Sequence, residues 1–198
     1  MNEVYNIIEN AAAEKIKIKR SLFIAHAGPV PTTTAAEEFI ERDRQKFHDA
    51  THHCYAYRID RDLFRFSDDG EPSGTAGQPI VNMLDKYHLF RAAVVVTRYF
   101  GGIKLGTGGL LRAYSEAAET VLSKMPRKKV IPVEHLKVLY PYPFTNQFNK
   151  IVHKFSVKII HSDFQEEVQA DLEIPVQHLS EFRESLLQAG AGKIKILA

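Results

Sequence analysis

Cysteine and long apolar runs are both scarce in this sequence. Cys54 is the single cysteine among 198 residues, so no intramolecular disulfide can form, and we expect a reducing, cytoplasmic environment. No close set of Cys and His residues suits a structural zinc site, so no metal is expected. No apolar run reaches the roughly 18 residues that span a bilayer, and the first residues do not resemble a signal peptide. We therefore expect no membrane association.

A strong excess of charge of one sign is also missing. The formal net charge is +2 and the isoelectric point is about 8.5, which does not by itself indicate a nucleic-acid partner. The charge is nevertheless uneven, because residues 97–129 contain seven basic and two acidic side chains, a local excess of five. This segment is either an anion-binding surface or a solvated basic face.

The hydrophobic pattern predicts a mixed α+β chain. In the first part it predicts strands at 15–19, 21–30, 54–59, 63–66 and 92–96, and helices at about 35–48, 79–88 and 110–123. The continuous apolar run 92–96 is typical of a fully buried strand. After residue 132 the pattern predicts the order β-α-β-β-α-β, at 133–140, 145–155, 157–163, 167–174, 176–189 and 194–197. That order is the ferredoxin-like plan.

The segment MPRKKVIP, residues 125–132, separates these two regions. Two prolines bracket three basic residues, and periodic segments lie on both sides. We therefore predict an exposed linker between two domains, residues 1–128 and 129–198.

A polar loop, SDDGEPSGTAGQP (67–79), follows the predicted hairpin of the first domain. Its carboxylates Asp68, Asp69 and Glu71 repel one another unless a cation, an arginine or backbone amides neutralise them. The hydroxyls of Ser73 and Thr75 follow. Oxygen ligands would suit magnesium. The alternative, which stays open, is a tight surface loop in which Asp and Gly form the turns and Ser and Thr cap the next helix.

A glycine-rich loop, TRYFGGIKLGTGG (97–109), joins the predicted buried strand to the next helix. Glycines let backbone amides approach a bound group, and a helix N-terminus adds partial positive charge. A cation at Arg112, early in the helix, is unfavourable unless an anion binds there. The alternative is that the glycines only permit a sharp turn and close packing. The candidate anion site comprises Arg98, Gly101, Gly102, Lys104, Gly106, Thr107, Gly108 and Arg112.

Two histidines precede the cysteine in THHCYAYR (51–58). On a strand, His52 and Cys54 share one face, but this spacing does not ensure the geometry of an activated thiolate. We expect a buried, inert cysteine, and no catalytic residue is assigned. His52 joins the residues of the polar loop as a candidate for the site.

The segments DATHHCYAYR, DDGEPSGTAGQP and VVVTRYFGGIKLGTGGLLRAY together resemble the IMPACT family, specifically its bacterial YigZ-type members. The resemblance covers the first domain nearly throughout and the second more weakly. It implies a first domain like domain 2 of ribosomal protein S5, with a four-stranded sheet and helices on one face. It also implies a ferredoxin-like second domain similar to the last domain of the translocation elongation factor. The family pattern assigns no proven catalytic role to these motifs.

Eukaryotic members of the family regulate translation through a protein partner, using an extra N-terminal domain that these 198 residues do not contain. We therefore do not carry that pathway over. The leading hypothesis is a translation-associated protein that binds RNA or a ribosome-associated partner through the surface 68–112. Tyr99 and Phe100 would stack on bases while Arg98 and its neighbours hold phosphate.

The alternative hypothesis is a phosphate- or nucleotide-handling enzyme. It would use the glycine-rich loop 101–109, with magnesium on Asp68, Asp69 and Glu71. A protein–protein adaptor is the third hypothesis. No cofactor is expected apart from magnesium under the enzyme hypothesis, and the oligomeric state is not predicted. If both loops leave the same edge of one sheet, their carboxylates and cations would form a single site that holds a ligand. The alternative is that the carboxylates pair with the arginines and close the cleft as a structural ion-pair network.

Overall fold

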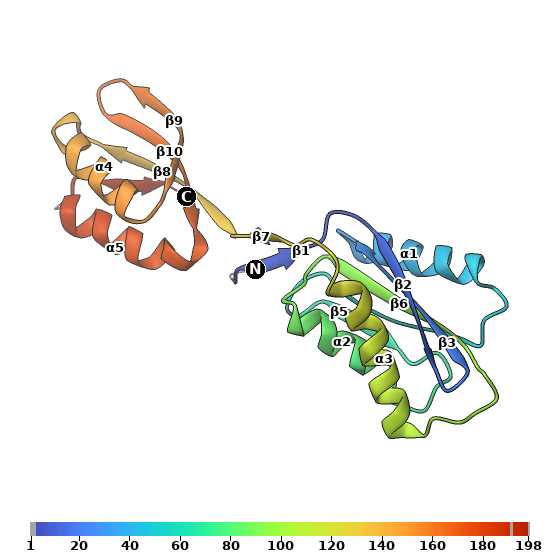
Figure 1. Ribbon diagram of the computed structural model, residues 1–198. Coiled ribbons are helices and arrows are strands. Elements are labelled where there is room, and N and C mark those ends of the chain that lie inside the picture. The colour runs from blue at the N-terminus through green and yellow to red at the C-terminus, as the bar shows by residue number, and fades with distance from the viewer. Residues whose placement is uncertain (1–2, 191, 198) are drawn as a thin grey trace. The chain divides into compact units, whose positions relative to one another are not determined.

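The computed structural model describes residues 3–190 and 192–197, so residues 1, 2 and 198, at the outer limits of the predicted domains, lie outside it. Within the described residues there are five α-helices and three β-sheets, the mixed α+β class that the sequence predicts (Figure 1). None of these helices is long and apolar enough to cross a membrane. The chain divides into two compact units, each described by itself: Tyr5–Val130, and the residues from Ile131 onward together with the N-terminal residues up to Val4.

The segment predicted to be an irregular linker contains a short strand. Strand β7 (Lys128–Val130) pairs antiparallel with β1 (Tyr5–Ile7), and the side chain of Met125 is buried. This pairing ties the segment to the first unit. The division therefore falls after Val130, two residues beyond the predicted boundary.

The first unit is built on a five-stranded antiparallel sheet with the order β2-β3-β6-β4-β5, not on four strands. Helices cover both of its faces, not one. The strands are β2 (Ala12–Ile18), β3 (Ser21–Pro29), β4 (His52–Arg58), β5 (Phe64–Ser67) and β6 (Ala92–Tyr99). The helices are α1 (Thr33–Lys46), α2 (Gly77–Lys86) and α3 (Thr107–Leu122).

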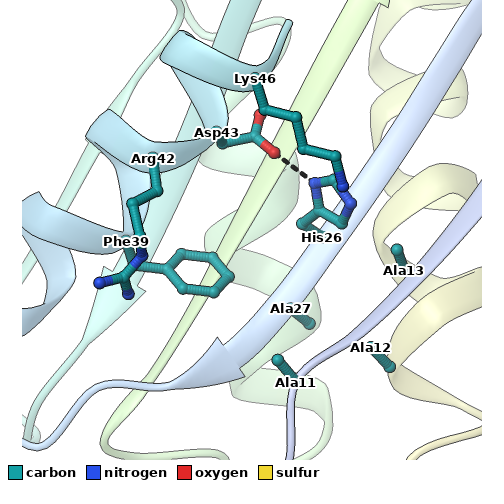
Figure 2. A pocket seen from close by; sticks show the side chains of 9 residues that line it. All are labelled: Ala11, Ala12, Ala13, His26, Ala27, Phe39, Arg42, Asp43 and Lys46. Atoms are coloured by element: carbon teal, nitrogen blue, oxygen red, sulfur yellow. Dashed lines mark hydrogen bonds and ion pairs between the residues drawn. The ribbon is translucent and has the colours of Figure 1, made fainter.

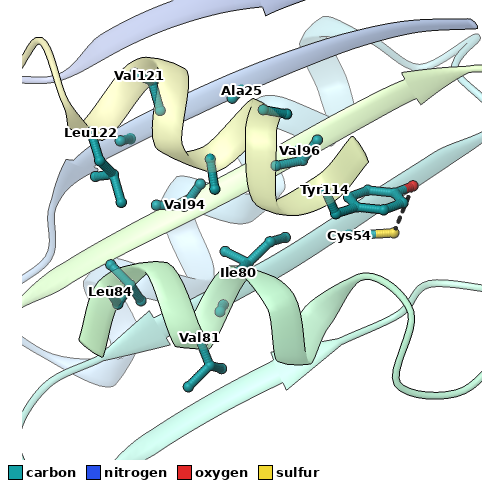
Figure 3. Packing of buried hydrophobic residues seen from close by; sticks show 14 of the residues in the cluster. Ala25, Cys54, Ile80, Val81, Leu84, Val94, Val96, Tyr114, Val121 and Leu122 are labelled. Atoms are coloured by element: carbon teal, nitrogen blue, oxygen red, sulfur yellow. Dashed lines mark hydrogen bonds between the residues drawn. The ribbon is translucent and has the colours of Figure 1, made fainter. Parts of the chain in front are cut away.

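Strand β6 explains why helices are needed on both faces. Val94 and Val96 belong to the core beneath α2 and α3, as Figure 3 shows, whereas Ala93 and Val95 pack on the side of α1. Figure 2 shows side chains of α1 directed toward β3 on that second side. The predicted burial of the whole run 92–96 is confirmed, and a strand that is apolar on both sides requires a cover on each.

The second unit has the predicted β-α-β-β-α-β order, and its sheet is antiparallel with the order β11-β8-β10-β9. Phe148, Phe182 and Leu186, from its two helices, are fully buried in one core with the sheet. A short 3-10 turn precedes each helix, η1 (Tyr142–Phe144) and η2 (Val176–His178). The elements are β8 (Val133–Tyr140), α4 (Thr145–Lys154), β9 (Lys158–Phe164), β10 (Val168–Pro175), α5 (Leu179–Gly190) and β11 (Lys195–Leu197).

Candidate functional site

Asp68 closes the polar loop over the start of α2. Its Oδ2 accepts the amide of Gly74 at 2.8 Å, and its Oδ1 accepts the amides of Ala76 and Gly77, each at 2.9 Å. Burial raises the pKa of Asp68, but these amide hydrogen bonds together outweigh burial and hold that pKa below its ordinary value. This carboxylate therefore caps α2, a role that the turn interpretation of the loop assigned to Ser and Thr.

Asp69 fastens the same loop to β4 and α1. Its Oδ2 accepts the backbone amide of His53 at 2.6 Å, and its Oδ1 lies 3.3 Å from the guanidinium of Arg44. Its carbonyl oxygen lies 2.8 Å from Nδ1 of His52. Because a carbonyl can only accept, that nitrogen carries a proton, and Nε2 of His52 is left for other partners.

Glu71 forms a buried ion pair with Arg98. Its Oε1 accepts a hydrogen bond from Nη1 of Arg98 at 2.5 Å and another from the Tyr114 hydroxyl at 2.8 Å. The two charged side chains are only 4% and 5% exposed. Nε2 of His52 lies 3.9 Å from the same carboxylate oxygen. Arg98 was predicted in a loop, but it belongs to β6, where the sheet register places it opposite His52. Its pair with Glu71 agrees with the alternative that the loop carboxylates form a structural ion pair with an arginine.

Cys54 lies beneath this network. Its Sγ is 3.0 Å from the carbonyl oxygen of Asp68 and 3.3 Å from the hydroxyl of Tyr114, and Figure 3 shows the latter contact. Burial, and then the charges of the nearby carboxylates, raise the pKa of the thiol. The prediction of a buried cysteine is confirmed.

A pocket of about 430 Å³ opens beside the Glu71–Arg98 pair, where both loops meet the start of α3. It brings together residues from three separate segments of the chain, 51–52, 71–72 and 98–110, including one carboxylate of the polar loop. Its lining includes His52, Glu71, Arg98, Phe100, Lys104 and Thr107. The predicted convergence of the two loops thus holds for Glu71, whereas Asp68 and Asp69 do not line the pocket.

The free positive charge of the pocket comes from Lys104 and from the N-terminus of α3. No carboxylate lies within ion-pair distance of Lys104 or of Arg112 in the part of the chain that the structure describes. Helix α3 begins after Gly106 with no side-chain cap and no acidic residue in its first turn. Its first amides, including that of Thr107, are therefore free to bind an anion.

The glycines also satisfy the packing interpretation. A Cβ at Gly101 would lie 2.2 Å from the backbone carbonyl of Arg20, so only glycine lets the β2–β3 turn approach this loop. Gly102 and Gly106 have φ values of 83° and 72°, in the left-handed region that favours glycine. Close approach and anion binding are compatible, because the helix amides stay free.

Several predicted residues have other roles. Thr75 is buried and donates its hydroxyl to the carbonyl of Pro72 at 2.6 Å, and Ser73 is exposed. Neither of them lines the pocket. Tyr99 points its hydroxyl at Asp49, 2.7 Å away, and this hydrogen bond raises the pKa of Tyr99. Phe100 is therefore the aromatic residue of the pair that borders the pocket, with 45% of its surface exposed.

The three carboxylates of the polar loop do not converge on a common cation. Each holds different protein partners: amides for Asp68, Arg44 and His53 for Asp69, and Arg98 with Tyr114 for Glu71. Among residues 3–190 and 192–197, no three His, Cys, Asp or Glu side chains cluster closely enough to hold a metal ion. Tyr114 is the member of the network that the sequence did not indicate as polar, because its spacing is that of an ordinary core residue.

Comparisons with known proteins agree on one family. The model of the Impact N-terminal domain matches residues 19–122. The IMPACT family member YvyE of Bacillus subtilis is 35% identical and aligns over 97% of this chain and 89% of its own. The IMPACT family member YigZ of Escherichia coli is 33% identical, over 92% and 91%.

A solved structure described as a hypothetical protein matches with a TM-score of 0.66 and 32% identity, over 100% of this chain and 98% of its own. The human Protein IMPACT is 35% identical over a shorter stretch, 44% of this chain and 29% of that protein. The family model covers more than half of this chain, and the bacterial relatives align along almost all of it. The chain therefore belongs to the IMPACT family.

Proposed function

We propose that the chain is a translation-associated protein that binds single-stranded RNA in the pocket beside α3. One observation carries this proposal: an unpaired lysine, an uncapped helix N-terminus and an exposed aromatic ring border the same pocket. Phosphate would bind Lys104 and the first amides of α3, and a base would stack on Phe100. The association with translation rests on the eukaryotic members of the family.

The buried ion pair has a positioning role in this proposal. Arg98 is neutralised by Glu71, so it adds little net charge for phosphate. Its guanidinium lies 5.4 Å from the ring centre of Phe100 and 5.3 Å from that of Phe23. Stacked between the two rings, it supports the Phe100 platform from below.

Neighbouring cations would extend the surface for a strand of RNA. Lys19 and Arg20 form the β2–β3 turn, whose backbone contacts the loop at Gly101. Both side chains are exposed. Together with Lys104 and Arg112 they would track the phosphate backbone past the pocket.

The proposal extends to the folds of the two units. We infer that the first unit is a variant of ribosomal protein S5 domain 2 and that the second is a ferredoxin-like domain. The second inference is supported by the β-α-β-β-α-β order and the sheet order β11-β8-β10-β9. Such folds host many functions, so the RNA proposal rests on the pocket.

Fluorescence anisotropy with a labelled single-stranded RNA tests the proposal. Log affinity should fall linearly with log salt, and Lys104→Ala or Arg112→Ala should each reduce the slope by about 0.7. Phe100→Ala should weaken binding by about 1–3 kcal/mol without changing the slope, because stacking involves no counterion release. The matched control is Lys86→Ala, since Lys86 pairs with Glu119, about 18 Å along α3 from Thr107. It should bind like the unmodified chain.

Absence of RNA binding at low salt would overturn the proposal. A parallel titration with ATP and magnesium tests the alternative, a nucleotide-handling enzyme. Binding of ATP with magnesium, lost in Lys104→Ala and without RNA binding, would favour that enzyme. The dispersed partners of the three carboxylates lead us to expect RNA binding instead.

A further inference from the structure

A second pocket, of about 310 Å³, lies on the α1 side of the sheet in the first unit. Figure 2 shows its floor of small side chains beneath the side chains of α1 and the imidazole of His26. The floor is formed by residues 11–13 and Ala27: Ala11 and Ala13 present their side chains on the α1 side, whereas those of Ala12 and Ala27 pack in the core on the other face of the sheet. The helix contributes Phe39, Arg42, Asp43 and Lys46, whose spacing places them on one face of α1. The RNA pocket and this pocket share no lining residue.

A buried polar cluster forms one wall of this second pocket. The carboxylate of Asp43 is 4% exposed and accepts a hydrogen bond from the Thr97 hydroxyl at 2.5 Å. Its other oxygen contacts Nδ1 of His26. With Nδ1 engaged by a carboxylate, Nε2 is the remaining polar atom of the ring, and it has no partner within the described residues. A side chain that is only 16% exposed thus borders the pocket with one nitrogen unused.

The rim of the pocket is positively charged. Arg42 and Lys46 have no carboxylate within ion-pair distance in the part of the chain that the structure describes. Asp43 is the one carboxylate in the lining, and its two oxygens are already taken by His26 and Thr97. The pocket therefore presents positive charge that no side chain of the cluster balances.

Apolar surface completes the pocket. The ring of Phe39 projects over the alanine floor between Arg42 on one side and His26 on the other (Figure 2). The volume is at the lower end of the roughly 300–1,000 Å³ that small-molecule sites occupy. A ligand that fits this lining has one anionic group and a compact, flat apolar body.

We infer that this pocket binds a small organic anion, a carboxylate or phosphate monoester on an aromatic or similarly compact body. The anionic group lies between Nε2 of His26 and the cations of α1, and the body lies on Phe39 and the alanines. This site is independent of the RNA pocket and of its function.

The ring of His26 lies between Asp43 and the anion. In the bound state its Nδ1–H donates to Asp43 and its Nε2–H donates to the anion. Asp43 and Lys46 are the charged groups of α1 beside the ring, and Arg42 lies across Phe39. The neighbouring strands present Thr97 from β6 and Ala13 from β2, which are neutral.

Nuclear magnetic resonance of the full chain, titrated with phenyl phosphate and with benzoate, tests this inference. At least one probe should shift amide signals of α1, residues 11–13 and His26. Inorganic phosphate, which lacks the apolar body, and benzyl alcohol, which lacks the charge, should bind more weakly.

Variants separate the site from a general charge effect. Lys46→Gln and His26→Gln should each weaken binding by about tenfold, the scale of one charged hydrogen bond. The matched control is Arg44→Gln, because Arg44 is the remaining cation of α1, pairs with Asp69 and does not line the pocket. Ala13→Leu fills the pocket from an exposed strand position on the same side as His26, so it should abolish binding without harming the fold.

Each negative result has a definite meaning. Absence of shifts at these residues with both probes at roughly 10 mM, far above useful affinity, overturns the inference. Unchanged affinity in a folded Ala13→Leu variant overturns it as well. If Arg44→Gln and Lys46→Gln weaken binding equally, the anion responds only to the net charge of α1. That result also overturns the inference.

Discussion

Removing the charge of Glu71 should destabilise the first unit more than any exposed ion pair could. Glu71 and Arg98 are 4% and 5% exposed, and Tyr114 donates its hydroxyl to the same carboxylate oxygen. Glu71→Ala leaves the guanidinium buried without a counter-ion and the phenol without an acceptor. Breaking one partner of a buried pair costs about 3–5 kcal/mol of the free energy of unfolding.

A double-mutant cycle separates the interaction energy of the Glu71–Arg98 pair from the cost of removing each side chain alone. Arg98→Met alone leaves the Glu71 carboxylate unpaired and should cost a similar amount. The double variant Glu71→Gln with Arg98→Met should cost clearly less than the sum, because no uncompensated charge stays buried. Glu71→Gln alone keeps the side-chain volume and one hydrogen-bond acceptor for Tyr114. Its loss of unfolding free energy should therefore lie between those of the double variant and of Glu71→Ala.

Native-state hydrogen exchange followed by mass spectrometry is the appropriate assay. The chain has no tryptophan and two units, so a single spectroscopic transition would mix their stabilities. Peptides from β6 and α3 report the first unit, and peptides from β8 and β10 serve as an internal control. A loss below about 1 kcal/mol in Glu71→Ala, the level of an exposed pair, would refute the reasoning.

Three further predictions follow from the same loops. Asp68→Ala should cost about 1 kcal/mol at neutral pH through loss of the α2 cap, measured by the same exchange assay. The pKa of Asp68 is lower in the folded state than in the unfolded state. Asp68 therefore contributes fully to the free energy of unfolding above its unfolded pKa of about 3.9, and this contribution is lost as pH falls through the folded pKa. The difference between wild type and variant should therefore shrink in acid, and a constant difference would contradict the cap. Cys54, with a buried thiol whose pKa is raised, should resist iodoacetamide until the first unit unfolds, and rapid alkylation of the native chain would contradict its burial. Gly101→Ala should disorder the β2–β3 turn, because its Cβ would lie 2.2 Å from the Arg20 carbonyl. Gly74→Ala should be milder although Gly74 has a positive φ of 75°, because its Cβ would meet no atom within 4 Å. Equal effects of the two substitutions in thermal unfolding would contradict this prediction.

The sequence by itself determined the order and type of most elements. The apolar run 92–96 predicted a strand buried on both faces, and the spacing after residue 132 predicted β-α-β-β-α-β. These are properties of neighbouring residues, since periodicity of side chains is a local signal. The same local logic located the glycine-rich loop at a strand-to-helix junction, where α3 does begin at Thr107.

The partners of the polar side chains could not be predicted in this way. The sequence left open whether Arg98 is a free cation or the partner of a carboxylate, and whether magnesium, an arginine or backbone amides neutralise Asp68. In the structure Arg98 pairs with Glu71, 27 residues away, and Asp68 binds backbone amides. The register that sets His52 opposite Arg98, and Phe23 opposite Arg98 on the other side, belongs to pairings across the sheet. A one-residue shift would turn each of these side chains to the other face.

Only the tertiary structure decided which charges stay free. Helix α1 on the second face of the sheet brings Asp43 to His26 and Thr97, and this cluster forms one wall of a pocket. No sequence motif predicted that pocket. On the other side of the sheet, Glu71 neutralises Arg98 and leaves Lys104 with the amides of α3 as the anion-binding groups. The physical reason is that burying a charge requires a partner, and the partner is supplied by whichever distant segment the fold brings within hydrogen-bond reach.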